Sequence, residues 1–138
     1  MFSRPIIFLT AALLTGCTGS HRAAGRAEGS APLARVMAGD LLVVHGEPVR
    51  LLNAQAPSLP PAAHCWAEAA LAVQAASLTE RLIGEAHKID LTREGRDAQG
   101  RTLARVSLDD RRDLGEALIF AGVASTPGPR ALDWCGPP

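Results

Sequence analysis

The sequence contains no tyrosine, only two tryptophans and three phenylalanines, and a single lysine, Lys88, among its 14 basic residues. It has no run of positive charge, which argues against sequence-independent binding to phosphate backbones. The scarcity of aromatic residues argues against a platform on which single-stranded bases stack. The N-terminal apolar run from Ile6 to Leu14 is much shorter than the ~20 residues that a membrane-spanning helix needs.

The first residues have the three parts of an export signal. Arg4 is the only charge, the apolar run follows, and the small residues Thr15-Gly16 precede Cys17. The segment Leu14–Cys17 resembles a bacterial lipobox, which implies cleavage before Cys17 and acyl chains on that cysteine; each buried CH₂ then contributes about 0.8 kcal/mol to anchoring. Thr18, rather than an aspartate, follows the cysteine, which favours sorting of the lipoprotein to the outer membrane, where it would face the periplasm. The alternative is a short buried helix at the N-terminus.

The three cysteines suggest one disulfide. If a lipid occupies Cys17, Cys65 and Cys135 remain as a pair. A bridge between them would close a loop of about 70 residues and stabilise the fold by ~4 kcal/mol. A zinc site formed by His64, Cys65 and Cys135 is the rival interpretation, but it offers at most three ligands and none of the usual spacings.

The rest of the chain divides into a tether and one domain. Removal of residues 1–16 takes away only Arg4, which leaves 13 basic against 14 acidic residues and a net charge of −1. Residues 17–33, the lipidated cysteine and a stretch rich in Gly, Ala and Ser, are predicted to be a flexible tether with a reach of ~20 Å. Residues 34–138 are enough for one small domain with one core.

The first half of this domain predicts a hairpin followed by a helix. The apolar runs Leu41–Val44 and Val49–Leu52 are joined through His45-Gly46, and Pro48 is expected to place the second strand near a sheet edge. Four residues then recur at helical spacing on one face, with Gly84 as the expected stop: Leu71, Ala75, Leu78 and Leu82.

The second half predicts two further strands and a short helix. Lys88–Thr92 and Arg101–Leu108 alternate between apolar and polar residues, and Asp109-Asp110 forms a turn. Asp113 caps a helix that Gly122 ends, with Glu116 placed for a capping box. The expected fold class is α+β, mainly β: a five-stranded OB-type barrel with two to three helices, one of them between the third and fourth strands.

Four segments match one family in order: Val36–Asp40, Val49–Ser58, Arg96–Ala104 and Leu114–Leu118. From about Ala34 to Cys135 the chain resembles the staphylococcal-nuclease-like (thermonuclease) domain family, here in a bacterial lipoprotein precursor. The third segment is the most specific, because Asp97 is followed by Gly100-Arg101 and then by a Leu-Ala strand. The closing Trp134-Cys135, with its cysteine paired to an earlier one, also resembles the C-terminal segment of exported bacterial members of the family.

The resemblance implies a site for phosphodiester cleavage. The family uses a calcium ion bound by two aspartates, a glutamate as general base and two arginines that hold the phosphate. Arg50 and Arg101 match the two phosphate-binding arginines, and Asp40 matches the first calcium aspartate. Calcium prefers several charged oxygen ligands, and guanidinium groups bind phosphate oxygens in pairs.

Two chemically essential positions depart from the family pattern. Gln55 replaces the second calcium aspartate, and Ser58 replaces the general-base glutamate. Loss of general-base catalysis alone typically costs ~10²–10⁴-fold in rate. Glu47 and Asp97 are the candidates for supplying a replacement carboxylate. Further departures lie at neighbouring positions of the pattern: Ala38, Leu41, Ala56 and Gln99.

Three interpretations follow from this partial match. The leading one is a catalytically impaired thermonuclease-like domain that acts as a binding or structural module, with no cofactor, or with Ca²⁺ only at a residual site. The second is an active or weak metal-dependent nuclease that hydrolyses nucleic acid. The third is a lipid-tethered domain that docks an envelope protein. Two simpler interpretations stay open: Arg50 and Arg101 as ion-pair partners, and Asp40 as a turn residue. Trp66 and Trp134 are expected in the core.

Overall fold

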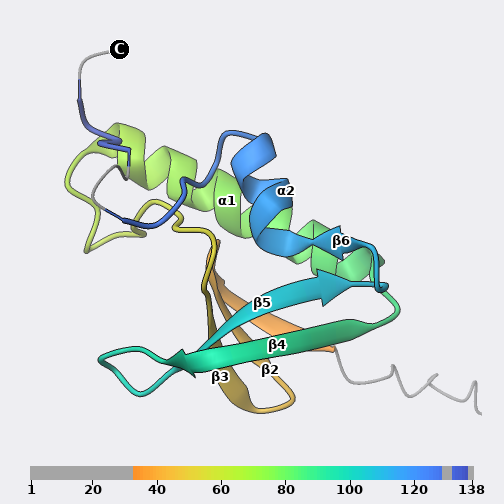
Figure 1. The fold of residues 1–138 in the computed structure, drawn as a ribbon. Helices are drawn as coiled ribbons and strands as arrows, with labels where there is room; N and C mark the ends of the chain where they lie inside the picture. The colour runs from red at the N-terminus through yellow and green to blue at the C-terminus, as the bar shows by residue number, and fades with distance from the viewer. Residues whose placement is uncertain (1–32, 129–131, 137–138) are drawn as a thin grey trace, which may run out of the picture. The chain divides into compact units, whose positions relative to one another are not determined.

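The computed structural model describes residues 33–128 and 132–136. The predicted signal peptide, Cys17 and most of the tether lie outside the described residues. The chain forms, in order, β1 Ala34–Ala38, β2 Leu41–Val44, β3 Glu47–Leu51, α1 Trp66–Glu85, β4 Ile89–Arg96, β5 Thr102–Leu108, β6 Arg112–Asp113 and α2 Leu114–Phe120 (Figure 1). In this described part no helix is both long enough and apolar enough to cross a membrane.

The strands form a single mixed sheet. Their order is β1-β2-β3-β5-β4, with the short β6 paired to β5, and all pairs are antiparallel except β3 with β5. The fold is mainly β with two helices, as predicted, but the closed five-stranded barrel is wrong: the sheet has six strands and is open. Arg93, Glu94 and Arg96 are exposed along β4, and such charges keep a sheet edge solvated.

The predicted hairpin is confirmed as β2 and β3. His45 and Gly46 have positive φ angles of 51° and 84°, which suits the two-residue turns that match strand twist. The prediction that Pro48 marks an edge strand is wrong, because β3 lies between β2 and β5. Pairing with β5 begins only at Val49, so the N–H that proline lacks removes no hydrogen bond on that side.

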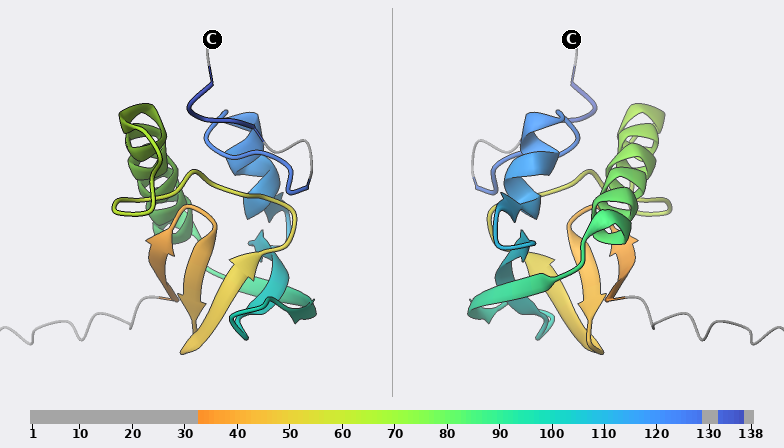
Figure 2. Two further views of the ribbon diagram at one scale, coloured as in Figure 1. Left: turned by 90° about the vertical axis from the view of Figure 1, so that its left-hand side faces the viewer. Right: turned by 90° about the vertical axis from the view of Figure 1, so that its right-hand side faces the viewer.

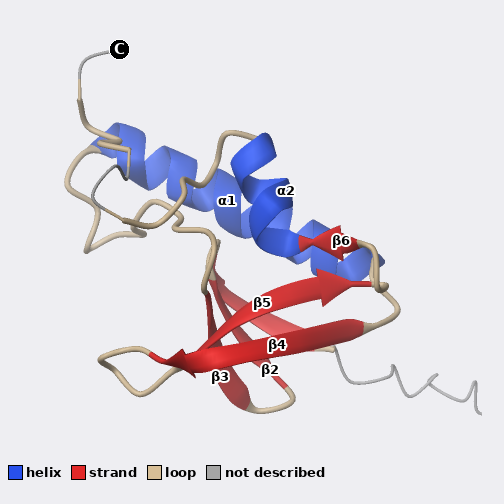
Figure 3. Ribbon diagram, viewed as in Figure 1, coloured by secondary structure: helices blue, strands red, loops and turns tan. Residues whose placement is uncertain are grey.

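Both helices lie on one side of the curled sheet, next to each other (Figures 2 and 3). In the chain, helix α1 follows the third strand and precedes the fourth, as predicted. The predicted buried face is confirmed in part, because Ala75 and Leu82 are buried whereas Leu71 and Leu78 are only half-buried. The residues that the helix buries are Glu68, Ala72, Ala75, Thr79, Leu82 and Ile83. Gly84 lies inside α1 and does not end it.

The second helix begins and ends as the sequence predicts. The side chain of Asp113 accepts a hydrogen bond of 2.9 Å from the N–H of Glu116, and Gly122 follows the helix with a φ of 73°. Asp109 and Asp110 both have positive φ angles, which confirms the turn before β6.

The core contains aliphatic side chains and no described aromatic residue. Its largest fully buried side chains are Leu42, Leu51, Leu114, Leu118, Val44, Val49, Val106 and Thr79. The prediction of a buried Trp66 is wrong: this first residue of α1 is 83% exposed, and Trp134 is half-buried. The aliphatic residues of the sheet and of the two helices fill the interior without them.

Candidate functional site

Asp40 is positioned by close packing between a turn and α1. Gly39 lies so near the helix that a Cβ on it would come within 2.6 Å of the Ala75 Cβ. The hydroxyl of Thr79 donates a hydrogen bond of 2.9 Å to the Gly39 carbonyl oxygen, and Leu51 N–H donates to the Asp40 carbonyl oxygen. The sequence analysis missed Gly39 and Thr79 because both act through contacts distant in the chain.

The Asp40 carboxylate faces Arg50. Its Oδ2 lies 3.5 Å from Arg50 Nε, and the side chains are 11% and 35% exposed. Burial raises the pKa of Asp40 above its ordinary value, while the positive charge of Arg50 and backbone hydrogen bonds oppose this rise. The charge of Arg101 also acts on Asp40, so the structure brings these three predicted site residues into one electrostatic neighbourhood.

Arg101 is held by its own loop. Its Nε donates a 2.6 Å hydrogen bond to Asp97 Oδ2, and its guanidinium also donates to Gln99 Oε1 at 3.1 Å. Asp97 Oδ1 accepts from the N–H groups of Gln99 and Arg101. Although burial opposes it, these hydrogen bonds lower the pKa of Asp97. Asp97 is therefore engaged in holding the loop.

A cavity of about 280 Å³ opens beside Arg50. Gln55 and Asp97 are its other hydrogen-bonding residues, and Leu103 and Pro127 are among its apolar walls. The backbone of Gln55 is fixed, since its N–H and its carbonyl oxygen both pair with Ser125. This cavity unites Arg50 with the substituted metal-ligand position.

Ser58 lines a different cavity, of about 230 Å³. It shares this cavity with Gln55, and its N–H donates a hydrogen bond of 3.0 Å to Glu68 Oε1. The substituted base position is thus turned toward the N-terminus of α1. Of the family's phosphate-binding and metal-binding positions, Gln55 lines this cavity with Ser58, and Asp40, Arg50 and Arg101 do not.

Glu68 is a buried carboxylate that the sequence analysis missed. Its Oε2 accepts hydrogen bonds from the N–H of His64 at 2.7 Å and approaches His64 Nδ1 to 3.0 Å. Hydrogen bonds from the backbone of His64 and then of Ser58 lower the pKa of Glu68 to about 2. The available signal was its place three residues after the helix cap at Cys65, where glutamate often binds back to the preceding backbone.

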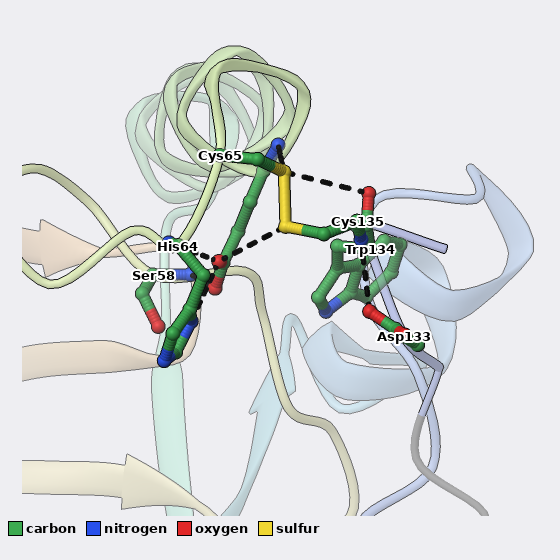
Figure 4. The surroundings of a disulfide bond; sticks show 7 residues. Ser58, His64, Cys65, Asp133, Trp134 and Cys135 are labelled. Carbon is green, nitrogen blue, oxygen red and sulfur yellow. Dashed lines mark hydrogen bonds and ion pairs between the residues drawn. A yellow bond between two sulfur atoms is a disulfide. The ribbon is translucent and has the colours of Figure 1, made fainter. Parts of the chain in front are cut away.

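The expected disulfide is present between Cys65 and Cys135, 70 residues apart. Figure 4 shows it joining the first turn of α1 to the C-terminal segment, with Ser58 and His64 nearby. Since thiolates bind zinc and disulfide sulfurs do not, the alternative zinc site with His64 is wrong.

Glu47, the other candidate for a replacement carboxylate, is also held by hydrogen bonds from neighbouring side chains. It accepts hydrogen bonds of 2.6 Å from both Arg93 and Thr102. The hydrogen bond from Arg93, followed by that from Thr102, lowers the pKa of Glu47 to about 2. It lies at the turn end of β3 and lines neither of the two cavities just described.

The sequence model of the staphylococcal nuclease homologue family matches residues 48–130, more than half of the chain. The chain belongs to the staphylococcal nuclease family. The match includes Arg50, Gln55, Ser58 and Arg101, whereas Asp40 precedes it. No curated protein matches the chain.

Nucleases of the staphylococcal family use Ca²⁺. Within residues 33–128 and 132–136, no three His, Cys, Asp or Glu side chains are grouped so that they could hold a metal ion. Asp40 carries a carboxylate, but it already faces Arg50 at 3.5 Å. The two calcium-binding positions of the family thus supply one carboxylate, that of Asp40, whereas calcium binds six to eight oxygens and favours charged ones.

Proposed function

We propose that this chain is an envelope lipoprotein whose staphylococcal nuclease domain serves as a binding or structural module and hydrolyses phosphodiesters poorly. The observation that carries the proposal is the division of the family site into two cavities. Arg50 lines one and Ser58 lines the other. Asp97 lines the first cavity and is already hydrogen-bonded to Arg101, and Glu68 lines the second and is already hydrogen-bonded to the loop before α1.

Glu47 and Glu68 are poor general bases. A base works best when its pKa lies near the working pH, whereas the pKa values of Glu47 and Glu68 are lowered to about 2 by their hydrogen bonds. The Ser58 hydroxyl has no accessible basic form at neutral pH. Activation of an attacking water therefore has no efficient agent among these groups.

What the geometry retains is the capacity to hold an anion. The Arg50 side chain is about one-third exposed beside its cavity, and a guanidinium can exchange a carboxylate partner for a phosphate oxygen pair. Binding of a phosphate-bearing ligand without cleavage is the activity that this arrangement supports best. A weak nuclease is the second candidate, favoured by the persistence of Asp40 next to Arg50.

The binding part can be tested by fluorescence anisotropy with a labelled single-stranded oligonucleotide in EDTA. Arg50→Ala should weaken binding about tenfold or more, because a charged hydrogen bond is worth about 1.5–3 kcal/mol. Arg81→Ala is the matched control, since Arg81 is exposed on α1 away from both cavities. Equal affinities of parent and both variants would contradict phosphate binding and favour docking to an envelope protein.

The lipoprotein part rests on Leu14–Cys17 and is tested by membrane fractionation. Cys17→Ser should leave an unanchored or uncleaved protein, whereas Cys135→Ser, which breaks only the disulfide, should keep the mature form in the membrane. A Cys17→Ser protein that still fractionates with outer membranes as the mature form would show that another feature provides the anchor.

A further inference from the structure

The C-terminal segment Leu132–Gly136, here called the C-terminal strap, forms one wall of the cavity beside Ser58. Two backbone N–H groups of the strap donate hydrogen bonds within it: Cys135 N–H to Asp133 Oδ1, and Gly136 N–H to the Asp133 carbonyl oxygen. In addition to the polypeptide backbone, the disulfide to Cys65 links the strap covalently to the body of the domain. The strap is also mostly exposed.

We propose that the Cys65–Cys135 disulfide is an exchangeable latch: a thiol attacks Cys135, Cys65 is released, and the C-terminal strap swings away from the cavity beside Ser58. The opened cavity would expose Gln55, Ser58 and the Glu68 carboxylate to a ligand. This inference does not depend on whether the domain binds phosphate. It concerns the access to one cavity and the chemistry of one bridge.

The surroundings of the two sulfurs are unequal and set the direction of attack. Cys135 is exposed, while Cys65 is half-buried at the first turn of the 20-residue helix α1. The N–H of Glu68 donates to Cys65 Sγ at 3.4 Å, and a helix N-terminus stabilises a thiolate. Cys65 is therefore the better leaving group.

The negative charge of the Glu68 carboxylate also favours attack at Cys135 over attack at Cys65. Its Oε2 lies 3.8 Å from Cys135 Sγ, so a thiolate on Cys135 would be repelled. In thiol–disulfide exchange the negative charge of the transition state is concentrated on the two outer sulfurs. Attack at Cys135 places that charge on the incoming thiol and on Cys65, and it leaves Cys135 Sγ, which lies 3.8 Å from Glu68 Oε2, as the less charged central sulfur.

The exchange balances as a two-electron transfer. A dithiol reductant, as a thiolate, forms a bond to Cys135 Sγ while the Cys65–Cys135 bond breaks and its electron pair goes to Cys65. The second thiol of the reductant then displaces Cys135 and closes a disulfide in the reductant. The net result is two protein thiols and one oxidised dithiol.

The direction of attack is tested by trapping the mixed disulfide. The full chain with Cys17→Ser, which leaves only the bridge cysteines, is treated briefly with glutathione, quenched with acid and mapped by peptide mass spectrometry. Glutathione should be found on Cys135 in at least about threefold excess over Cys65, since the thiolate that its surroundings stabilise better departs faster. Equal labelling, or an excess on Cys65, would overturn the proposed asymmetry.

Release of the strap is tested with the two tryptophans. In the Cys17→Ser chain, Trp66→Phe leaves Trp134 as the only fluorophore, and acrylamide quenching is compared before and after reduction with dithiothreitol. The quenching constant of Trp134 should rise about twofold. In the matched control, Trp134→Phe, the remaining Trp66 is already 83% exposed and should show no change. Either an unchanged Trp134 or loss of the far-UV circular dichroism of the fold on reduction would refute the latch.

Discussion

Replacement of Gly39 by alanine tests the contact that positions Asp40. The added Cβ would lie 2.6 Å from the Ala75 Cβ and 2.8 Å from the Ala56 Cβ, whereas carbon atoms in favourable contact are about 3.5–4.0 Å apart. Neither alanine can rotate its methyl group away, so the helix or the turn must shift. Overpacking of this kind costs about 1–3 kcal/mol, and we expect the upper end because two neighbours are struck.

A loss of about 3 kcal/mol should lower the melting temperature of a domain of this size by roughly 10–20 °C. Ala75→Gly removes one of the two clashes, but by itself it costs about 1 kcal/mol in helix propensity. Combined with Gly39→Ala, it should therefore be less harmful than the sum of the two single changes by about 1–2 kcal/mol.

Thermal and urea unfolding with the disulfide intact measure these effects. Gly84→Ala is the control, because Gly84 lies in the same helix with open space around it and the change should stabilise by about 0.5–1 kcal/mol. If Gly39→Ala unfolds within 0.5 kcal/mol of the parent, or if its effect adds simply to that of Ala75→Gly, the close approach of turn and helix is refuted.

Three further predictions concern charged groups of the site. The pKa values of Glu47 and Glu68 are lowered to about 2. Their contribution to the free energy of unfolding is therefore complete above about pH 4.5 and is lost as the pH falls toward 2. Urea unfolding midpoints that do not move over this pH range would contradict the prediction. Burial raises the pKa of Asp40, so its ionisation disfavours folding as the pH rises; Asp40→Asn should melt above the parent at pH 7, with a smaller difference at pH 4. Gln55→Asp with Ser58→Glu should give more calcium-dependent hydrolysis of single-stranded DNA than either change alone, because metal and base act on one water; a folded, inert double variant would show that other positions matter as much.

Local signals in the sequence predicted much of the fold. The His45-Gly46 turn and the Asp113 cap depend on a few neighbouring residues, and both are present as expected. The alternation of β5 was also read correctly, since Ala104 and Val106 are buried within that strand. These features were accessible because strand alternation, turn chemistry and helix capping operate within a few residues.

Long-range packing could not be read in the same way. The close approach of α1 to Gly39 is made through Ala75 and Thr79. Of the leucines that the periodicity highlighted, Leu82 is buried, whereas Leu71 and Leu78 are half-buried. Whether the sheet closes depends on how β1 and β4 meet, and no local pattern encodes that. The openness of the sheet therefore had to come from the structure.

The sequence assigned residues to the candidate site but did not give their geometry. Asp40, Arg50 and Arg101 were assigned through the family pattern, and the structure places them within reach of one another's charge. The partition of Ser58 into another cavity was not predictable, because it depends on Glu68, a residue ten positions away that draws in the Ser58 N–H.

The most direct test of the account is a cleavage assay on the unaltered domain. Heat-denatured DNA is incubated with purified protein in calcium or in EDTA, and acid-soluble nucleotides are followed over time, with Arg50→Ala as the control for contaminating nucleases. The account predicts no calcium-dependent release above that of Arg50→Ala. Rapid calcium-dependent release by the parent that is abolished in Arg50→Ala would contradict the claim that this staphylococcal nuclease domain has lost efficient catalysis.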